Sequence, residues 1–415
     1  MKIGLLASHP IQYLSPWLCC LDDRVDLTVF YVHNPSDAER GQSGFGADVD
    51  WDVDLLQGYS HTFLQNAAAS PDVSDQAFFG LDAPGLYDRI SADRFDAFIV
   101  MGWHAKAFWQ AVWACRRAGV PVLARGDSQL SPTTPTWKQI VKRILYPPLL
   151  RVFDGFLTVG TRFHEYLRHY AVPTSALFHV PHLIDVDRFA HQAAQARSEG
   201  HVTALQHRMG LSDEDVVFLF VGKFIEKKRP HDFIDALCTY NRATSGPRGA
   251  VGVMVGTGSL EAALHRHAAS LDAPVHFEGF RNQTELPAYY ALADTLVLPS
   301  EWGETWGLVV NEAMACGTPA LVSDAAGCTP DMIDPGETGY RFPVGDVNAL
   351  SRCMKRLAAS PSDAWRAALA EKTRQHSPAY AADCTVDALR CLLTRSSLSY
   401  AEPTSGLPRP PFAAL

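Results

Sequence analysis

The feature that most constrains this chain is a regular alternation of short apolar runs with helical stretches. The apolar runs are rich in β-branched and aromatic residues, and segments with helical periodicity, such as residues 105–117, lie between them. This alternation is typical of βαβ units built around a parallel sheet. Buried strands are predicted at residues 3–7, 27–32, 97–101, 120–124 and 156–159. The N-terminal half is therefore expected to be an α/β domain.

The alternation stops once and then starts again, which predicts two domains. Residues 190–210 are rich in Ala, Gln, His, Arg and Ser and lack strand signals, and the rhythm restarts with the apolar run at residues 216–221. Further strands are expected at residues 250–255, 275–277, 295–298 and 319–322. A chain of 415 residues is also too long for one ordinary core. We expect an N-terminal domain over residues 1–190, a linker over 191–212, a C-terminal domain over 213–395 and a poorly ordered tail over 396–415, which holds four prolines.

Composition narrows the functions open to such a chain. A net charge of −9 argues against a general nucleic-acid binder, which needs a basic face, and a hydrophobic content of 47% is that of a globular protein. No apolar run reaches the roughly 18 residues that span a bilayer, and the first apolar stretch is too short for a signal peptide. The nine cysteines are scattered without metal-ligand spacing. These features predict a cytoplasmic protein with reduced cysteines.

A cationic turn follows the first predicted strand of the second domain. Lys223, Lys227, Lys228 and Arg229 come directly after the run at residues 216–221. In doubly wound domains ligands lie at the carboxyl ends of the strands, so two such domains would bind a ligand in the cleft between them. Cations at that place suit a diphosphate. The alternative is a solvated basic loop in front of a helix, since charge runs are common on surfaces.

The most informative segment, residues 298–319, has the pattern of a strand, a glycine-containing loop, a short helix and the next strand. A helix that starts near Gly307 would present free backbone N–H groups to an anion. Glu304 precedes that start and Glu312 lies within the helix, and helical geometry would not put both carboxylates on one face. They are expected to serve separate ends of one extended ligand, one at a sugar ring and the other at a ribose. The alternative is a helix-dipole carboxylate at Glu304 and an exposed helical Glu312.

These residues resemble the retaining glycosyltransferases of family 4, the group 1 class with the GT-B fold. Two glutamates separated by seven residues are the hallmark of that family, and Glu304 and Glu312 fit it. The resemblance extends, in the family's order, through residues 222–223, 228, 255–258, 277–280 and 313–319. It implies an α/β protein of two doubly wound, Rossmann-like domains facing a cleft. It also implies transfer of a sugar from a nucleotide diphosphate donor with retention of anomeric configuration.

The resemblance assigns roles within the donor site. Lys228, and Lys223 where the family usually has arginine, would bind the donor diphosphate and stabilise its charge. Glu304 would contact the transferred sugar, and Glu312 would contact the ribose. The remaining donor-binding candidates are Thr305, Gly307, Leu308, Phe280 and Arg281, with the backbone at 307–308 near the distal phosphate and the backbone at 280–281 near the base. A UDP- or GDP-sugar is the expected donor, with no cofactor and no metal, because the lysines and the helix start already supply positive potential.

The N-terminal half resembles the family more loosely. A His-Pro-Ile-Gln-Tyr turn at residues 9–13 replaces the usual glycine-rich turn and resembles a subgroup that also carries Trp-Asp at residues 51–52. Near the expected hinge, His182 departs from the family's Pro-Asn-Gly-Val-Asp pattern. The candidates for the acceptor side of the cleft all follow predicted strands and are His9, Gln12, His104, Arg125 and Asp127. His104 is also a catalytic candidate, since the family often keeps a cleft histidine there. For each of them a purely structural role is the alternative.

Residues 136–145 have the pattern of a basic amphipathic helix, with Lys138, Lys142 and Arg143 among apolar residues. Helices of this kind lie on membrane surfaces, so a peripheral contact with the inner face of a membrane stays open. An ordinary amphipathic surface helix of a βα domain has the same pattern.

Three functions are compatible with the sequence. The residues favour a glycosyltransferase acting on an unknown acceptor in the synthesis of a glycan, a glycolipid or a glycosylated metabolite. A sugar-nucleotide epimerase of the same architecture would need acid and base groups aimed at the sugar and no acceptor site. A sugar-nucleotide-binding subunit without catalysis is the third. A Rossmann oxidoreductase is disfavoured, because no G-x-G-x-x-G follows the first strand.

Overall fold

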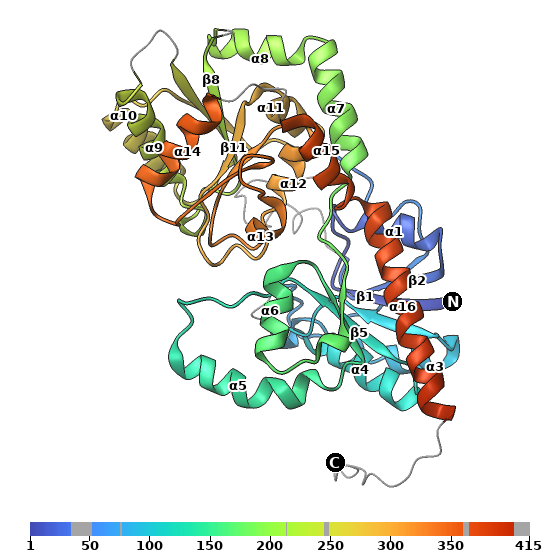
Figure 1. Cartoon of the computed structure of the whole chain (residues 1–415). Helices are drawn as coiled ribbons and strands as arrows, with labels where there is room; N and C mark the ends of the chain where they lie inside the picture. The colour runs from blue at the N-terminus through green and yellow to red at the C-terminus, as the bar shows by residue number, and fades with distance from the viewer. Residues whose placement is uncertain (35–51, 75–76, 213, 245–248, 360–364, 402–415) are drawn as a thin grey trace.

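The computed structural model describes residues 1–34, 52–74, 77–212, 214–244, 249–359 and 365–401. They form two α/β domains, one above the other in Figure 1, each built around a parallel sheet. The predicted fold class, two doubly wound Rossmann-like domains, is confirmed.

The N-terminal domain contains a sheet of seven strands in the order β3-β2-β1-β4-β5-β6-β7. The strands are β1 Lys2–Ala7, β2 Asp26–Tyr31, β3 His61–Phe63, β4 Ala97–Val100, β5 Val122–Gly126, β6 Gly155–Thr158 and β7 Leu177–His179. Its helices are α1 Ser15–Asp22, α3 Leu86–Asp93, α4 Lys106–Ala118, α5 Thr136–Leu150 and α6 Thr161–His169. β1 pairs in parallel with both β2 and β4, so the strand order reverses between β1 and β4. Among the strands described in this domain, the sequence missed the two edge strands, β3 and β7, which are three residues long and too short to show a period. It also missed the edge strand at residues 339–342 of the second domain.

The C-terminal domain repeats this topology with six strands in the order β10-β9-β8-β11-β12-β13. The strands are β8 Val216–Val221, β9 Ala250–Val255, β10 Val275–Gly279, β11 Thr295–Leu298, β12 Ala320–Ser323 and β13 Gly339–Phe342. Its helices are α9 Pro230–Arg242, α10 Glu261–Ser270, α11 Leu286–Leu292, α12 Val309–Ala315, α13 Thr329–Met332, α14 Val347–Ala358 and α15 Arg366–Arg374. The reversal between β8 and β11 places the carboxyl ends of both strands at a point where a ligand can enter.

The segment expected as a linker, residues 191–212, is mostly helical. It belongs to α7 (Val186–Ser198) and α8 (His201–Met209), and α7 packs against α11 and α12 of the C-terminal domain. The chain therefore passes from one domain to the other before residue 186. Ala, Gln and Arg, which predicted the absence of strands here, are good helix formers.

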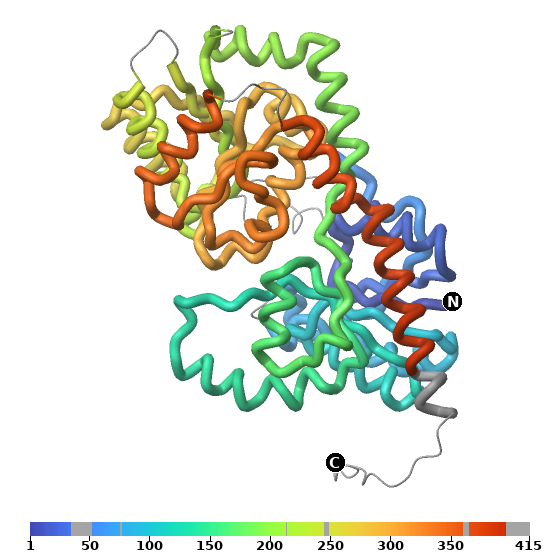
Figure 2. The backbone as a smooth tube through the Cα atoms, viewed as in Figure 1, coloured from blue at the N-terminus to red at the C-terminus, as the bar shows by residue number. Residues whose placement is uncertain are grey.

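The last described helix, α16 (Pro378–Ala401), leaves the C-terminal domain and packs along α1 of the N-terminal domain. Figure 2 shows both passages of the chain between the domains, the green one before α7 and the red one that leads into α16. Leu389 and Leu392 of α16 join Trp17 and Leu18 of α1 in the core beneath the N-terminal sheet. The helix ends at Ala401, and Pro403 follows. The poorly ordered tail expected from residue 396 stays a prediction. Residues 402–415 lie outside the described part of the chain.

Candidate functional site

A pocket of about 460 Å³ lies between the two domains at the carboxyl ends of the C-terminal strands. Residues that follow β8, β9, β10 and β11 line it from one side, and residues that follow β1 and β5 line it from the other. Of the candidates from the sequence, it brings together Gln12, Asp127, Lys223, Lys228, Phe280, Arg281, Glu304, Thr305, Gly307, Leu308 and Glu312. Both halves of the chain thus contribute to one site, as the doubly wound topology requires.

Three lysines from the turn after β8, Lys223, Lys227 and Lys228, line this pocket. Burial lowers the pKa of Lys223, and the positive charges of Lys228 and Lys227 lower it further. An anion placed among these lysines would stabilise the charged form of Lys223, which its neighbours disfavour. The basic turn is therefore a half-buried wall of the pocket and not a solvated surface loop.

Lys228 donates a short hydrogen bond to Oε2 of Glu304, and the two side chains are 14% and 10% exposed. Glu304 lies in the loop between β11 and α12, where its N–H donates to the carbonyl of Glu301 at 2.9 Å and its own carbonyl accepts from Gly327 at 2.9 Å. The loop is fixed on both sides of the carboxylate. The ion pair therefore holds a cation and an acceptor of hydrogen bonds side by side at the pocket wall.

Glu312 lies in α12 and is buried. The hydroxyl of Tyr290 donates to its Oε2 at 2.6 Å. Burial raises the pKa of Glu312, and the hydrogen bond from Tyr290 opposes this rise. An exposed helical glutamate, the alternative from the sequence, is excluded. A buried carboxylate that borders a pocket retains acceptor capacity for a ligand's hydroxyl groups.

Glycine is required at position 307, where the chain turns into α12. Gly307 has φ +106°, and a Cβ there would lie 2.6 Å from Cδ2 of Leu298. The tight turn lets the backbone of Gly307, Leu308 and Val309 line the pocket just behind Glu304.

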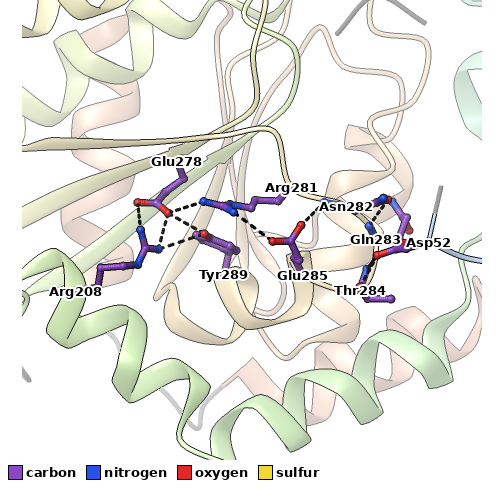
Figure 3. Close-up of polar contacts among 9 residues, drawn as sticks. All are labelled: Asp52, Arg208, Glu278, Arg281, Asn282, Gln283, Thr284, Glu285 and Tyr289. Carbon is purple, nitrogen blue, oxygen red and sulfur yellow. Dashed lines mark hydrogen bonds and ion pairs between the residues drawn. The ribbon is translucent and has the colours of Figure 1, made fainter. Parts of the chain in front are cut away.

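The edge of the pocket formed by Arg281 is braced by a network of charged and polar side chains (Figure 3). The guanidinium of Arg281 lies 3.5 Å from Glu278 and 3.2 Å from Glu285. Glu278 also accepts hydrogen bonds from Arg208 at 2.6 Å and from Tyr289 at 2.7 Å. Burial acts to raise the pKa of Glu278, but these hydrogen bonds outweigh it and the pKa is lowered. Arg281 is therefore held as a fixed wall of the pocket.

Polar contacts join the two domains at the pocket and beside it. The hydroxyl of Thr305 donates to Asp127 at 2.8 Å. At the other side, Asp52 accepts hydrogen bonds from the backbone N–H of Thr284, at 3.0 Å, and from its hydroxyl (Figure 3). Both carboxylates come from loops of the N-terminal domain, so the width of the pocket depends on how the domains meet.

The remaining N-terminal candidates do not line this pocket. Arg125 is buried and donates to the carbonyls of Val180 and Pro181 at 2.8 and 2.9 Å, which ties β5 to the segment that crosses between the domains. Burial and the neighbouring His33 lower the pKa of His9 to about 4. His104 lies in a second cavity, with its ring 5.1 Å from that of Phe108.

The second cavity, of about 880 Å³, lies in the N-terminal domain beside α5. Aromatic side chains dominate its wall, namely Phe78, Trp103, Trp109, Trp113, Tyr146 and Tyr166. Its polar residues include His104, Arg125 and Asp127. Asp127 lines both cavities, so the second one adjoins the pocket at that residue.

The site residues predicted from the sequence do not include Tyr13, His182 and Gln283, which also line the pocket. The ring of His182 lies 5.3 Å from that of Trp306 and 5.2 Å from that of Tyr13. Tyr13 and His182 belong to the two motifs in which the sequence departs from the family pattern, which was the available signal. For Gln283 there was none.

Neither a metal centre nor a membrane span is found within the described residues. No group of three or more His, Cys, Asp or Glu side chains is placed to hold a metal ion in the described ranges. Across the same part of the chain, every helix is too short or too polar to cross a membrane.

Comparisons with known proteins agree with this geometry. Residues 203–376 match the family of glycosyl transferases group 1. The GDP-mannose-dependent α-(1-6)-phosphatidylinositol monomannoside mannosyltransferase of Mycolicibacterium smegmatis is 32% identical over 198 residues, which are 46% of this chain and 49% of that protein. The D-inositol 3-phosphate glycosyltransferase of Geodermatophilus obscurus is 30% identical over 244 residues, which are 55% of this chain and 49% of that protein.

The chain thus spans about half the length of these curated relatives. Among solved structures, that of HepE from Anabaena in complex with UDP superposes with a TM-score of 0.64 at 16% identity, covering 97% of this chain and all of the other. At this identity the superposition bears on the fold, which is GT-B. The match to the glycosyl transferases group 1 family covers residues 203–376, which include most of the C-terminal domain.

Proposed function

We propose that this protein is a retaining glycosyltransferase that transfers a sugar from a nucleotide diphosphate donor to an acceptor held by the N-terminal domain. One observation carries the proposal. A single pocket between the domains combines three lysines with two buried glutamates, and it adjoins a second cavity through Asp127. Two substrates can therefore meet at one place.

Each part of the donor is assigned to a different part of the pocket. Lys223 and Lys228 neutralise the diphosphate, with the backbone at residues 307–308 and the hydroxyl of Thr305 beside it. Glu304, fixed by Lys228, accepts hydrogen bonds from the transferred sugar. Glu312 does the same for the ribose, and the base lies against Phe280 and Arg281.

In the proposed reaction the bond between the anomeric carbon and the diphosphate breaks, and the diphosphate oxygen keeps the electron pair. The acceptor hydroxyl attacks from the same face and passes its proton to the leaving phosphate. Fixed positive charges aimed at the leaving group stabilise this transition state without reorganisation. The lysines fill this role in the proposal, so a chelator is expected to leave turnover unchanged.

A UDP- or GDP-sugar is the proposed donor. In support, the Anabaena neighbour was crystallised with UDP, and the mycobacterial relative is named for GDP-mannose.

The proposal is tested by calorimetry and thermal shift of the purified protein against UDP-, GDP-, ADP- and dTDP-sugars. One nucleotide class is expected to bind selectively, and Lys228→Met is expected to abolish that binding. Lys106→Met is the matched control, because Lys106 is also ion-paired, with Asp82 at 2.6 Å, but does not line the pocket. Absence of binding by any nucleotide sugar would overturn the donor assignment.

Measurements of turnover distinguish a glycosyltransferase from an epimerase and from a non-catalytic subunit. With the donor that binds, release of a free epimer without an acceptor would indicate an epimerase. Binding without any turnover across a panel of acceptors would indicate a non-catalytic subunit. NMR of the product's anomeric proton then checks retention.

A further inference from the structure

Helix α5 turns its apolar side away from the protein. The side chains on that side are among the most exposed large hydrophobic residues described, at 44–67% exposure, and they are Trp137, Ile140, Val141, Ile144 and Leu145. The opposite side contacts the domain, where Leu150 is buried and the ring of Tyr146 lies 4.9 Å from that of Tyr170. These contacts explain why the helix continues past its expected end at residue 145, through Pro147 and Pro148. An ordinary amphipathic surface helix has the reverse orientation, with its apolar side on the core.

The charge of α5 is entirely positive. Lys138, Lys142 and Arg143 lie within Thr136–Leu150 and Arg151 follows, whereas no acidic residue occurs between Asp127 and Asp154. At 100° per residue, Lys138 and Lys142 lie on one flank of the exposed apolar face, and Arg143 lies on the other. In a chain with a net charge of −9 this is a local excess of cations. An apolar stripe between two cationic flanks matches the interface of an anionic bilayer.

The inner side of α5 forms a wall of the second cavity. Lys142, Tyr146 and Leu149, one turn apart along the helix, all line it. The cavity extends from there to Asp127, where it meets the donor pocket. A helix resting on a bilayer would therefore hold the mouth of this cavity close to the lipid head groups.

We propose that α5 docks this protein on an anionic membrane surface, and that the second cavity takes its acceptor from that surface. The acceptor is then the polar head of a membrane lipid. The docking stands on α5 alone, whereas the identity of the acceptor rests on the proposed function. A symmetric contact between α5 and the α5 of a second copy would bring like charges together, whereas an anionic bilayer is complementary to the charge of α5.

Docking is tested by flotation of the full-length protein with vesicles. Binding is expected to vesicles of phosphatidylcholine mixed with phosphatidylglycerol, and only weakly to phosphatidylcholine alone. Arg143→Glu is expected to reduce binding by about fivefold or more, since each basic residue near an anionic surface contributes roughly that factor. Arg390→Glu makes the same charge change at an exposed site on α16 and is expected to leave binding unchanged.

The apolar face is tested separately with the double variant Ile140→Gln, Ile144→Gln. Glutamine is a good helix former, so the helix is kept while two exposed apolar side chains are lost. Binding to anionic vesicles is expected to fall at least about tenfold, with an unchanged thermal transition and unchanged nucleotide binding. Equal binding of wild type and both variants, or self-association through α5 in place of vesicle binding, would refute docking on a membrane.

The acceptor is tested with a radiolabelled nucleotide sugar and vesicles made from the polar lipids of the source cells. Label is expected to appear in the organic phase, and the α5 variants are expected to reduce this transfer more than they reduce donor binding. Transfer to water-soluble sugars alone would overturn the lipid acceptor. Calorimetry distinguishes this outcome from a failure of the proposed function. If the proposed function is wrong, the protein binds no donor but still binds vesicles.

Discussion

The ion pair between Lys228 and Glu304 leads to a sharp prediction for Lys228→Met. Both side chains are nearly buried, at 14% and 10% exposure, and their charged groups are in direct contact. Removing one partner of such a pair leaves an uncompensated charge in a poorly solvated place, which costs about 3–5 kcal/mol. Because both groups retain slight access to water, we expect about 3 kcal/mol, which is roughly a 150-fold change in the unfolding constant.

The double variant Lys228→Met, Glu304→Gln removes both charges. It is expected to recover about 2 kcal/mol of this loss, because neither charge remains unpaired. Urea unfolding followed by tryptophan fluorescence measures four proteins, namely wild type, the single variants Lys228→Met and Glu304→Gln, and the double variant. Nucleotide binding is expected to stay absent in the double variant, because the cation is still missing.

The exposed pair of Lys106 with Asp82, at 39% and 19% exposure, is the control. Lys106→Met is expected to cost less than about 1 kcal/mol. Additive effects of the substitutions at Lys228 and Glu304 would refute the coupling, and with it the claim that Lys228 fixes the position of Glu304.

Two further predictions concern the same site, and one concerns the buried His376, whose ring lies 6.2 Å from that of Trp306. Gly307→Ala introduces a Cβ 2.6 Å from Leu298 at a positive φ, so it is expected to destabilise the fold by about 2 kcal/mol in urea unfolding and to weaken nucleotide binding in calorimetry. Burial lowers the pKa of His376 from 6.5 to about 4. As the pH falls below 6.5, this histidine is therefore protonated in the unfolded state before it is protonated in the folded state. The free energy of unfolding is expected to decrease by about 3 kcal/mol as the pH falls from 6.5 to about 4. His376→Phe is expected to remove this part of the pH dependence in thermal melts. The pKa of Lys223 is lowered from 10.5, so the affinity for UDP is expected to decrease already below pH 10.5 as the pH rises. In Lys223→Arg the side chain stays charged, so calorimetry is expected to show no such decrease in affinity.

The sequence predicted the features that depend on local pattern. The strands from residues 216–221 to 319–322 were visible as apolar runs between helical stretches, and their parallel order followed from the connections. Because the carboxyl ends of parallel strands meet at one edge of the sheet, the residues after β8 and β11 were expected in one site, and the structure brings them into one pocket. Their roles in binding and catalysis stay predictions.

Contacts between distant parts of the chain were not visible in the sequence. The pairing of Lys228 with Glu304 and of Tyr290 with Glu312 depends on tertiary packing, and no spacing encodes it. The same holds for α5, since amphipathic periodicity shows that a helix has an apolar side but not which way that side points. Its exposure became known only from the structure.

The passage of α16 back to the N-terminal domain has a consequence for biosynthesis. The apolar side chains beneath the N-terminal sheet, among them Trp17 and Leu21, are covered by α16, the last described helix, through Ala382 and Leu389. During translation this surface stays uncovered until the last described residues leave the ribosome, long after the N-terminal strands have formed. Completion of the first domain therefore waits until α16 has been synthesised, and ribosome-bound chains that stop before α16 should be clients of chaperones.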